Sequence, residues 1–553
     1  MKFFCNFKKI LATSLLLGTF AVLTACAGGT APAGDPSALI GTDDIFDLPN
    51  DTVGEITVMM WSGSGQFLTD VGRRNFADDE ITAQNDAALI ATARAFNRIF
   101  PNIQVNIHNR IGGPEGDGIS WDQYRQNFAM EFGHYPDLFA VHNLVDDVMR
   151  GIVADLSIFA DDPMVQAFNP AVLELMTIEG RLFALPQYLL PWGVFVNKSL
   201  AEARNLDVPS PQWTLDEFVR FVSNSAPNEF YGLMSPPWDF VDSGTLDFHY
   251  QLMNRQEGEP FVRLNSDATR NLLAQMPAVL PHAVWAQNTA GLVDSAFMDD
   301  NWWWGHRFFQ QGRLLVAPGD PWMMGDLAMP GTDGTATMAQ WDIFPRPSTP
   351  YVGNHVGVVS DPMAIFNFAM NDGDPALSEE EYQQLLIAWT FLQFKTGDTR
   401  AWEERSTQLY AVDGGYRVAA NDSFPFVTGQ AFYDQMELWF RGGRERFADP
   451  HLMPGFHYVL ELWEQGAFVP FSDKSVPWHF EFEGTSRMIT FEWANKWSAD
   501  VAGVGEADPG WLDMVFSRLP DWDTEINQRF ADAYVALADA VARFYPPQTR
   551  PSA

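Results

Sequence analysis

The chain has 553 residues, 46% of them hydrophobic, which is enough for two to four domains with large cores. Its formal net charge of −37, from 71 acidic and 34 basic side chains, repels phosphate backbones and excludes nucleic acid as a partner. The same charge disfavours anionic ligands, because no cluster of basic residues offsets it.

The N-terminus predicts export and attachment to a lipid. Lys2, Lys8 and Lys9 precede an apolar run, Ile10 to Val22, and the segment Leu23-Thr24-Ala25-Cys26 follows. This order is typical of a signal peptide, here residues 1–25, and the run is shorter than the roughly 20 apolar residues of a spanning helix. The last four residues resemble the bacterial lipobox. The resemblance implies that Cys26 is acylated and holds the protein on the extracytoplasmic face of the cell membrane.

Residues 26–50 are rich in Ala, Gly, Pro and Asp and have no periodic pattern, so we expect a flexible tether that begins at the lipidated Cys26. The other cysteine, Cys5, lies within the signal peptide. The exported chain therefore has no disulfide.

Alternating strand and helix patterns open the folded part. We predict strands over 55–61, 103–107 and 136–141, and helices over 83–100 and 120–132, with a turn at 62–65. A strand, a helix and a strand in this order form a βαβ unit, so the fold class is α/β.

Further along, several motifs occur in a fixed order. They are Gly180 to Pro186 followed by Gly193 to Leu200, then Pro211 to Phe218, Phe308 to Trp322, Asp342 to Pro347 with Gly353 to Val359, and Ala388 to Phe394. In the motif Pro211 to Phe218, Thr214 and Glu217 have the spacing of a capping box, which predicts a helix start.

Together these motifs resemble the extracellular solute-binding proteins of ABC importers, in the sugar-binding group related to maltose-binding protein. The chain departs from the family pattern at Arg181, Phe183 and Val196, where the family has Lys, Tyr and Tyr. The resemblance covers roughly residues 55 to 400. It implies a two-lobed periplasmic-binding-protein-like fold with hinge crossovers and a cleft between the lobes.

The implied lobes divide the chain as follows. Lobe 1 holds 51–187 plus 345–400, and lobe 2 holds 188–344 plus 401–553 with a C-terminal extension. The chain crosses between the lobes near Gln187 and Pro345, where Gly193 and Pro345-Arg346-Pro347 suit a hinge. Within the extension, the sequence predicts an amphipathic helix over 527–544.

Ligand contacts are expected in loops at the carboxyl ends of the strands, where open α/β sheets bind. The chain has 20 Trp, and indole faces pack well on the C–H faces of sugars. The candidate ligand-binding residues are Trp61, Gln66, His142, Asn143, Tyr188, Trp192, Trp322, Gly353 and Asn354. In Asn301-Trp302-Trp303-Trp304, at least one indole is expected to be exposed.

The sequence contains no recognisable motif for catalysis or for metal binding. The 71 acidic residues supply many carboxylate pairs, but no pair is singled out as the acid and nucleophile of a glycosidase, so no catalytic residue is predicted. His451 and His457 lack the spacing of a zinc helix. Asp521, Asp523 and Glu525 begin like a calcium loop, but Ile526 replaces the required glycine, and we interpret them as a solvated acidic loop. No cofactor is predicted.

The sequence therefore predicts a lipid-anchored, monomeric binding protein of an ABC transporter that carries a carbohydrate, most simply an oligosaccharide, to permease transmembrane subunits. Two alternatives remain open at this stage. One is a surface glycan-binding or sensor protein without transport. The other is a carbohydrate-active enzyme.

Overall fold

The computed structural model describes residues 39–547 except 63–66, 78, 112–120, 142, 227–228, 235–257, 262, 285–307, 310, 320–339, 351, 371–375, 413–414, 420–422, 442–443, 471–478, 483–484 and 489–509. The signal peptide, Cys26, Gln66, His142, Trp322 and the run Trp302-Trp303-Trp304 lie outside the described residues.

A mixed sheet forms the framework, with the strand order β10-β9-β12-β6-β1-β4-β3. β1 (Gly54–Met59) pairs in parallel with both β4 (Ile103–His108) and β6 (Leu138–Ala140). α1 (Gln84–Ile99) connects β1 to β4, and α2 (Trp121–Phe132) precedes β6. The predicted βαβ unit is confirmed, because every apolar segment that was expected to form a strand or helix here does so.

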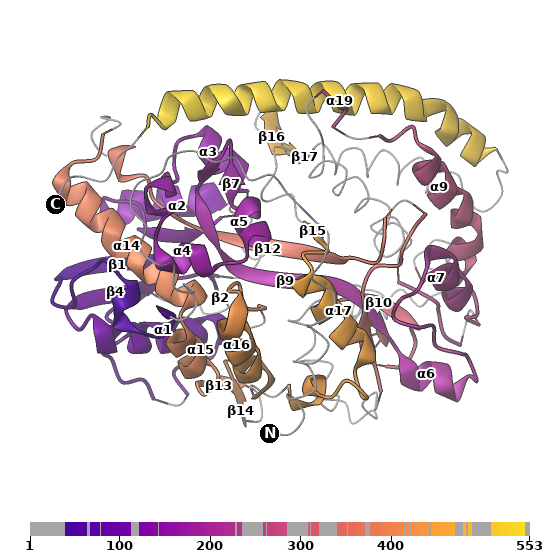
Figure 1. The fold of residues 1–553 in the computed structure, drawn as a ribbon, viewed down its shortest axis with the longest axis horizontal. Coiled ribbons are helices and arrows are strands. Elements are labelled where there is room, and N and C mark those ends of the chain that lie inside the picture. Colours follow the sequence, from indigo (N-terminus) through magenta and orange to yellow (C-terminus); the bar gives the residue numbers. More distant parts are fainter. Residues whose placement is uncertain are drawn as a thin grey trace, which may run out of the picture. The chain divides into compact units, whose positions relative to one another are not determined.

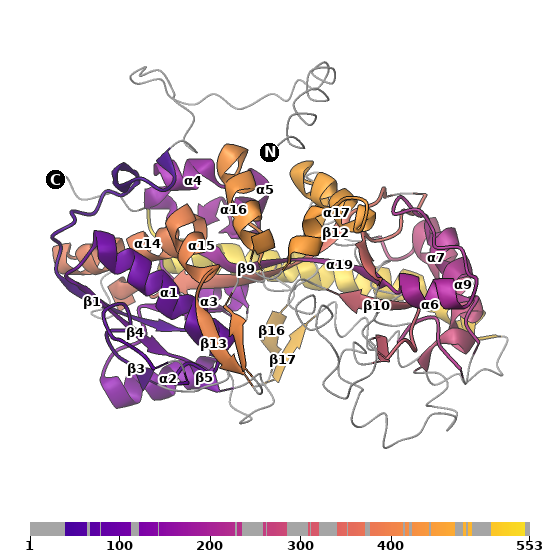
Figure 2. The same ribbon diagram turned by 90° about the horizontal axis from the view of Figure 1, so that it is seen from below.

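Two long strands lead from this part of the sheet to the next. β9 (Ala184–Val196) and β12 (Val356–Ile365) are antiparallel, with register from Ala184↔Ala364 to Trp192↔Gly357. Beyond Trp192, β9 exchanges β12 for β10 (Val316–Gly319) and β11 (Asp342–Phe344). Figure 2 shows both long strands running between the two ends of the sheet. The change of partners falls five residues after Gln187, where the crossing was predicted.

A glycine is required at position 193, where β9 changes partners, because the surrounding atoms leave no space for a Cβ atom. A Cβ placed there would lie 2.6 Å from both the Phe344 carbonyl oxygen and Ile343 Cγ1. Glycine within a strand often marks such a close backbone approach.

The buried side chains form two hydrophobic cores. Alternate residues of β9 face different cores, Phe195 the larger one and Val194 and Val196 the smaller one, as the two-residue period of a strand requires. We call β1, β4 and β6 with α1, α2, α3 (Leu144–Met149) and α14 (Glu379–Gly397) the β1 group. The β10 group is β10, β11 and the end of β9, with α6 (Lys198–Ala203), α7 (Leu215–Val222) and α9 (Asp267–Val279).

The helix start predicted from Thr214 is confirmed. The Thr214 side chain accepts a hydrogen bond from the Glu217 amide, and the Glu217 carboxylate accepts one from the Thr214 amide, which completes the capping box of α7.

The stretch after residue 400 packs in two places. α15 (Thr399–Arg405), α16 (Gly429–Arg441), α17 (Pro454–Glu464) and β15 (Phe468–Pro470) contribute to the larger core, while Val515 to Phe530 contribute to the smaller one. The expected division placed all of 401–553 with lobe 2. In the structure, 401–468 packs with the β1 group and with one face of β9 and β11.

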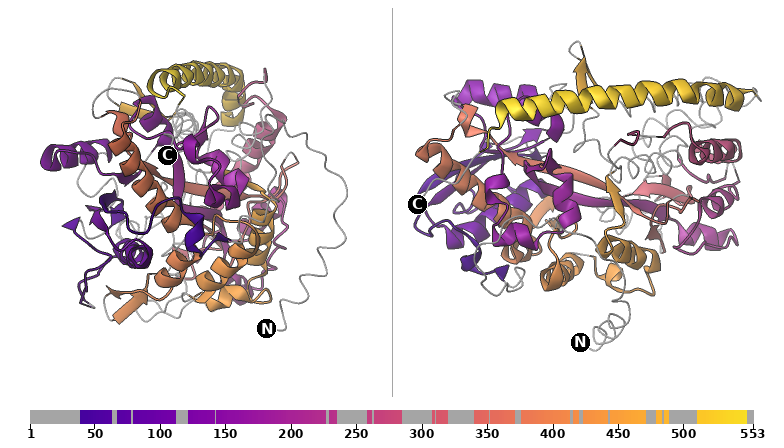
Figure 3. Two further views of the ribbon diagram at one scale, coloured as in Figure 1. Left: turned by 60° about the vertical axis from the view of Figure 1, so that its left-hand side comes forward. Right: turned by 45° about the horizontal axis from the view of Figure 1, so that its top comes forward.

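α19 (Trp511–Phe544) begins well before the helix predicted over 527–544. Asp521, Asp523 and Glu525 lie within it, so their interpretation as a loop is wrong. Pro520 lies within the helix at an exposed position, and its missing N–H removes one backbone hydrogen bond. Figure 3 shows α19 in yellow as one continuous helix.

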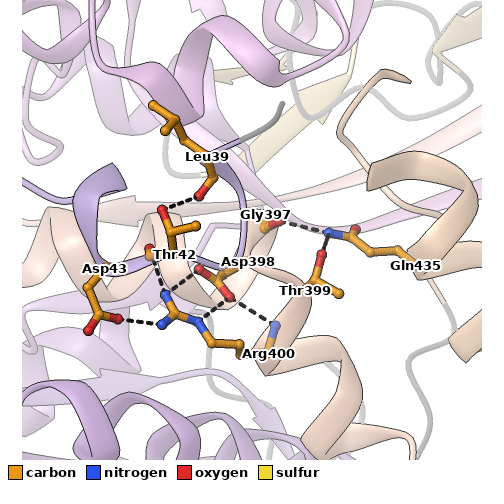
Figure 4. A network of polar contacts seen from close by, with 8 residues as sticks. All are labelled: Leu39, Thr42, Asp43, Gly397, Asp398, Thr399, Arg400 and Gln435. Carbon is orange, nitrogen blue, oxygen red and sulfur yellow. Dashed lines mark hydrogen bonds and ion pairs between the residues drawn. The ribbon is translucent and has the colours of Figure 1, made fainter. Parts of the chain in front are cut away.

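The described chain begins packed against α15. Arg400 donates to the Asp43 carboxylate at 2.5 Å, to the Thr42 carbonyl at 3.0 Å and to Asp398 at 2.9 Å (Figure 4). Ile45 and Leu48 are buried in the larger core, next to the 3-10 helix η3 (Asp43–Ile45). The last part of the expected tether, residues 39–50, is therefore part of the folded body.

The remaining elements are short and complete the layers seen in Figure 1. They are β2 (Trp61–Ser62), β3 (Phe67–Leu68), β5 (Arg110–Ile111), η4 (Ser157–Phe159), α4 (Pro163–Ala167), α5 (Pro170–Leu175), β7 (Thr177–Ile178), β8 (Arg181–Leu182), η6 (Leu280–His282), η7 (Phe368–Met370), β13 (Leu409–Val412), β14 (Gly415–Val418), η8 (Glu445–Ala448), β16 (His479–Phe482) and β17 (Thr485–Met488). In the described part of the chain, no helix has the length and apolar character needed to cross a membrane.

Candidate functional site

The carboxyl ends of β1, β4 and β6 meet at one edge of the sheet. β12 pairs with β6 only along its last residues, from Met363↔Ala140 to Ile365↔Leu138, so the first half of β12 continues past the carboxyl end of β6. That half pairs with β9 up to Trp192 and leads to the β10 group. The loops after β1 and β6 therefore start at the edge from which the chain crosses to the β10 group.

β10 ends at the point where β9 changes partners. β10 is antiparallel to β9, and its last residue, Gly319, lies opposite Gly193. Along β9, the position level with the end of β6 (Leu185) and the position opposite Gly319 (Gly193) are eight residues apart, roughly 26 Å. The loops of the two groups therefore begin at opposite ends of this connecting stretch, which we call the junction.

Three of the predicted site residues, Gln66, His142 and Trp322, lie outside the described residues. For Trp61 in β2 and Tyr188 in β9, the structure describes the backbone alone, with Trp61 opposite Arg110 and Tyr188 opposite Asp361.

Trp192 is buried, with 6% of its surface exposed, at the last β9 position that pairs with β12. Asn143 is also buried, and its side-chain oxygen accepts a hydrogen bond from the Asp146 amide at 3.0 Å. It is the N-cap of α3, a role that stabilises a helix start and uses one acceptor of the side chain.

Asn354 stabilises the second crossing, near Pro345, through hydrogen bonds. Its amide nitrogen donates to the carbonyls of Trp213, at 2.8 Å, and Arg346, at 3.1 Å, and its oxygen accepts from the Tyr458 hydroxyl at 3.5 Å. Its neighbour Gly353 is exposed, and its carbonyl lies 2.9 Å from His355 Nδ1. Both hydrogen bonds that the Asn354 side chain donates are to backbone carbonyls.

Two polar residues at the junction were missed by sequence reasoning. Gln187 is 1% exposed, and within the described chain neither atom of its amide has a hydrogen-bond partner. It lies in β9 where the register with β12 shifts, between Asp361 and Pro362. Buried polar groups normally have partners, so an unsatisfied amide at this place needs an explanation. A single polar residue within the apolar run from Leu182 to Val196 was its signal in the sequence.

His355 is the second missed residue. It is buried, and burial lowers its pKa to about 4, with a further lowering by the charge of Arg346. Because Nδ1 lies next to the Gly353 carbonyl, which only accepts, the proton is on Nδ1, and Nε2 is an acceptor without a partner in the described chain.

One buried carboxylate, that of Asp342, joins β11 to the start of α17. Asp342 in β11 accepts hydrogen bonds from the Gly455 and Phe456 amides, at 2.9 and 3.1 Å, and caps the start of α17. Lys198 Nζ lies 3.7 Å away, while burial raises the pKa of Asp342. These contacts assign Asp342 to structure.

Metal ligands are not grouped in the described ranges, where no three His, Cys, Asp or Glu side chains are placed to hold an ion. His457 Nε2 lies 2.9 Å from the Phe447 carbonyl.

Comparison with solved structures identifies relatives of this fold. An ABC substrate-binding protein of Listeria monocytogenes, in complex with cycloalternan, superposes with a TM-score of 0.53 at 14% identity, over 87% of this chain and 100% of that one. Maltose-bound MalE3 of T. maritima superposes with a TM-score of 0.50 at 15% identity, over 85% of this chain and 99% of that one. The first is a substrate-binding protein, and the second is bound to maltose. The sequence matches no family model and no curated protein sequence.

Proposed function

We propose that this chain, whose fold is that of the solute-binding proteins of ABC transporters, is a lipid-anchored binding protein that captures a carbohydrate for import. The ligand is an oligosaccharide held between two lobes. The lobes close on it and present it to permease subunits.

The observation that carries the proposal is that the strands of two groups end at opposite ends of the stretch where β9 pairs with β12. In the described part of the chain, β9 and β12 are the strands that connect the β1 and β10 groups within the main sheet. β1 and β6 end on one side of the connecting stretch, and β10 ends on the other. A ligand that touches both groups favours their closed arrangement, because it gains contacts only there. The two superposed proteins bind cycloalternan and maltose, which supports a carbohydrate here.

The proposed lobes follow the packing. Lobe 1 is the β1 group with α15, which contacts α1, and α16, which contacts α15. Lobe 2 is the β10 group with the first half of α19, which packs in the smaller core. The change of partners at Trp192 and Gly193 is the proposed hinge in β9.

The proposed contacts combine flat aromatic faces with amide groups. Trp61, Tyr188, Trp192 and Trp322 supply the faces, and Gln66, His142, Asn143, Gly353 and Asn354 surround them. We add Gln187, because a sugar hydroxyl would satisfy the buried amide that has no described partner. Sugar hydroxyls both donate and accept, as this amide requires.

The lipid anchor is a separate part of the proposal and has its own test. Expressed in a bacterial host, the chain should yield an N-terminal peptide that starts at Cys26 and carries a diacylglyceryl mass. The variant Cys26→Ser should keep residues 1–25 and lack that mass. An intact signal peptide on the unmodified, membrane-bound chain would disprove lipidation at Cys26.

Carbohydrate binding is tested by calorimetric titration of residues 27–553 with maltose, larger linear and cyclic glucans, monosaccharides and polyols. We expect saturable 1:1 binding of an oligosaccharide with a Kd near or below about 1 μM, equivalent to about −8 kcal/mol. The sugar should be recovered unchanged, whereas turnover would assign an enzyme. A folded protein that binds nothing in the panel would overturn the carbohydrate assignment.

A further inference from the structure

α19 is a 34-residue helix, about 50 Å long, with one continuous buried face. Its buried positions recur every three or four residues, which keeps them on one side of the helix. They are Val515, Leu519, Trp522, Ile526, Phe530, Ala533, Leu537, Val541 and Tyr545, which follows the helix as its C-cap. The opposite side is exposed, as at Val535, with 64% exposure.

The first half of this face belongs to the smaller core. Val515, Leu519, Trp522, Ile526 and Phe530 pack there with residues of α7 and α9. Phe261 stacks on Phe530 and on Tyr534, with ring centroids 5.6 and 5.1 Å apart. The Asp523 carboxylate accepts a hydrogen bond from the Asn265 amide at 3.2 Å. This half is therefore fixed to the β10 group.

The second half belongs to the larger core, through Leu537, Val541 and Tyr545. The Tyr545 ring packs edge-on against Phe183 at 4.8 Å, and its hydroxyl donates to the Val148 carbonyl of α3 at 3.3 Å. Arg181, which pairs with Asp155, donates to the Tyr545 carbonyl at 2.5 Å. The end of α19 is thus attached to α3 and to the residues that lead into the crossing strand β9.

We propose that α19 is a strap that joins the β1 and β10 groups and limits their relative movement. One rigid helix is attached to α3 at one end and to α9 at the other, and Figure 1 shows it running from one to the other. A hinge motion about β9 and β12 therefore has to bend the helix or release one attachment. The attachment to α3 releases first, because it buries three large apolar side chains, whereas the attachment to the β10 group buries five.

The strap is tested by distance measurements between the two groups without ligand. Residues 27–553 contain no cysteine, so spin labels at Val53→Cys, before β1, and Glu202→Cys, in α6, are the sole labels. In the labelled parent, pulsed electron paramagnetic resonance should give a narrow distribution of distances between the two labels. Val541→Ala with Tyr545→Ala should broaden it at least twofold. Val535→Ala, on the exposed side of α19, is the matched control and should leave it unchanged.

An unchanged distribution in the folded V541A/Y545A protein would overturn the proposal. Hydrogen exchange of the unmodified chain provides a second test that needs no variant. Amides of 532–544 should exchange as slowly as those of α3. Fast exchange over 532–544 beside slow exchange over 515–530 would show that the helix is not attached to the β1 group. Both readouts are independent of any sugar, so failure of the carbohydrate assignment does not affect them.

Discussion

At the scale of single residues, the junction contains polar groups with different tasks. Asn143 caps α3, Asn354 fastens a crossing and Asp342 caps α17, so part of each side chain's hydrogen-bonding capacity serves the backbone. Gln187 differs, because its amide is buried without a partner in the described chain. Burial without hydrogen bonds costs free energy, which is tolerated most readily where a ligand supplies them.

Gln187→Met separates ligand binding from structure. Replacing an unpaired buried amide by an apolar side chain of similar length should leave the free energy of unfolding unchanged or raise it by up to about 1 kcal/mol. Affinity for the oligosaccharide should fall at least tenfold. Calorimetry and urea unfolding measure the two effects. A variant that is destabilised by more than 2 kcal/mol with unchanged affinity would assign Gln187 to structure alone.

His355 predicts a dependence of stability on pH. Its folded pKa of about 4 lies below the unfolded value of 6.5, so the unfolded chain binds the proton more tightly between these values. The stabilisation is fully present above about pH 6.5 and is lost as the pH falls toward 4, by about 2 kcal/mol at pH 4.5. His355→Gln should remove this part of the difference between pH 7 and pH 4.5 in urea unfolding. His451→Asn, at an exposed position, is the control. An identical pH dependence in H355Q and parent would refute the assignment.

At the scale of elements, the helices and strands predicted from residue 55 to residue 141 lie where the structure has them. The βαβ unit and the capping box of α7 depend on neighbouring residues, and both are confirmed. The start of α19 could not be predicted, because Pro520 and three nearby acidic residues favour a break when the sequence is considered alone. The helix continues because Leu519, Trp522 and Ile526 bury one side of it in the smaller core. Tertiary packing thus outweighs local propensity here.

Gly193→Ala tests the close approach of β9 and β11. The new Cβ would meet a backbone oxygen and a buried side chain at 2.6 Å, so one strand has to shift. We expect a loss of about 1–3 kcal/mol in the free energy of unfolding. Gly353→Ala is the matched control, since a Cβ there meets nothing within 4 Å, and it should change stability by less than about 0.5 kcal/mol. Equal effects of the two substitutions would contradict the account of Gly193.

At the scale of the whole molecule, ordered motifs predicted the fold class, which the superposed structures confirm. The packing of 401–468 with the larger core was not predicted, because contacts between distant segments leave no periodic mark in the sequence. The candidate site residues were predicted from their expected positions at the carboxyl ends of strands. Asn143 follows β6 as expected, whereas Asn354 precedes β12 and does not lie at the carboxyl end of a strand. The hydrogen bond from Asn354 to Trp213 could not be predicted, because the two residues lie far apart along the chain.

The central claim is that one carbohydrate contacts both groups at the junction. Hydrogen exchange measured with and without the best-binding sugar of the panel tests it most directly. The account predicts slower exchange in two regions at once, residues 60–62 and 141–144 at the ends of β1 and β6, and residues 316–319 of β10. Protection confined to one group, or protection in neither at saturating sugar, would contradict it.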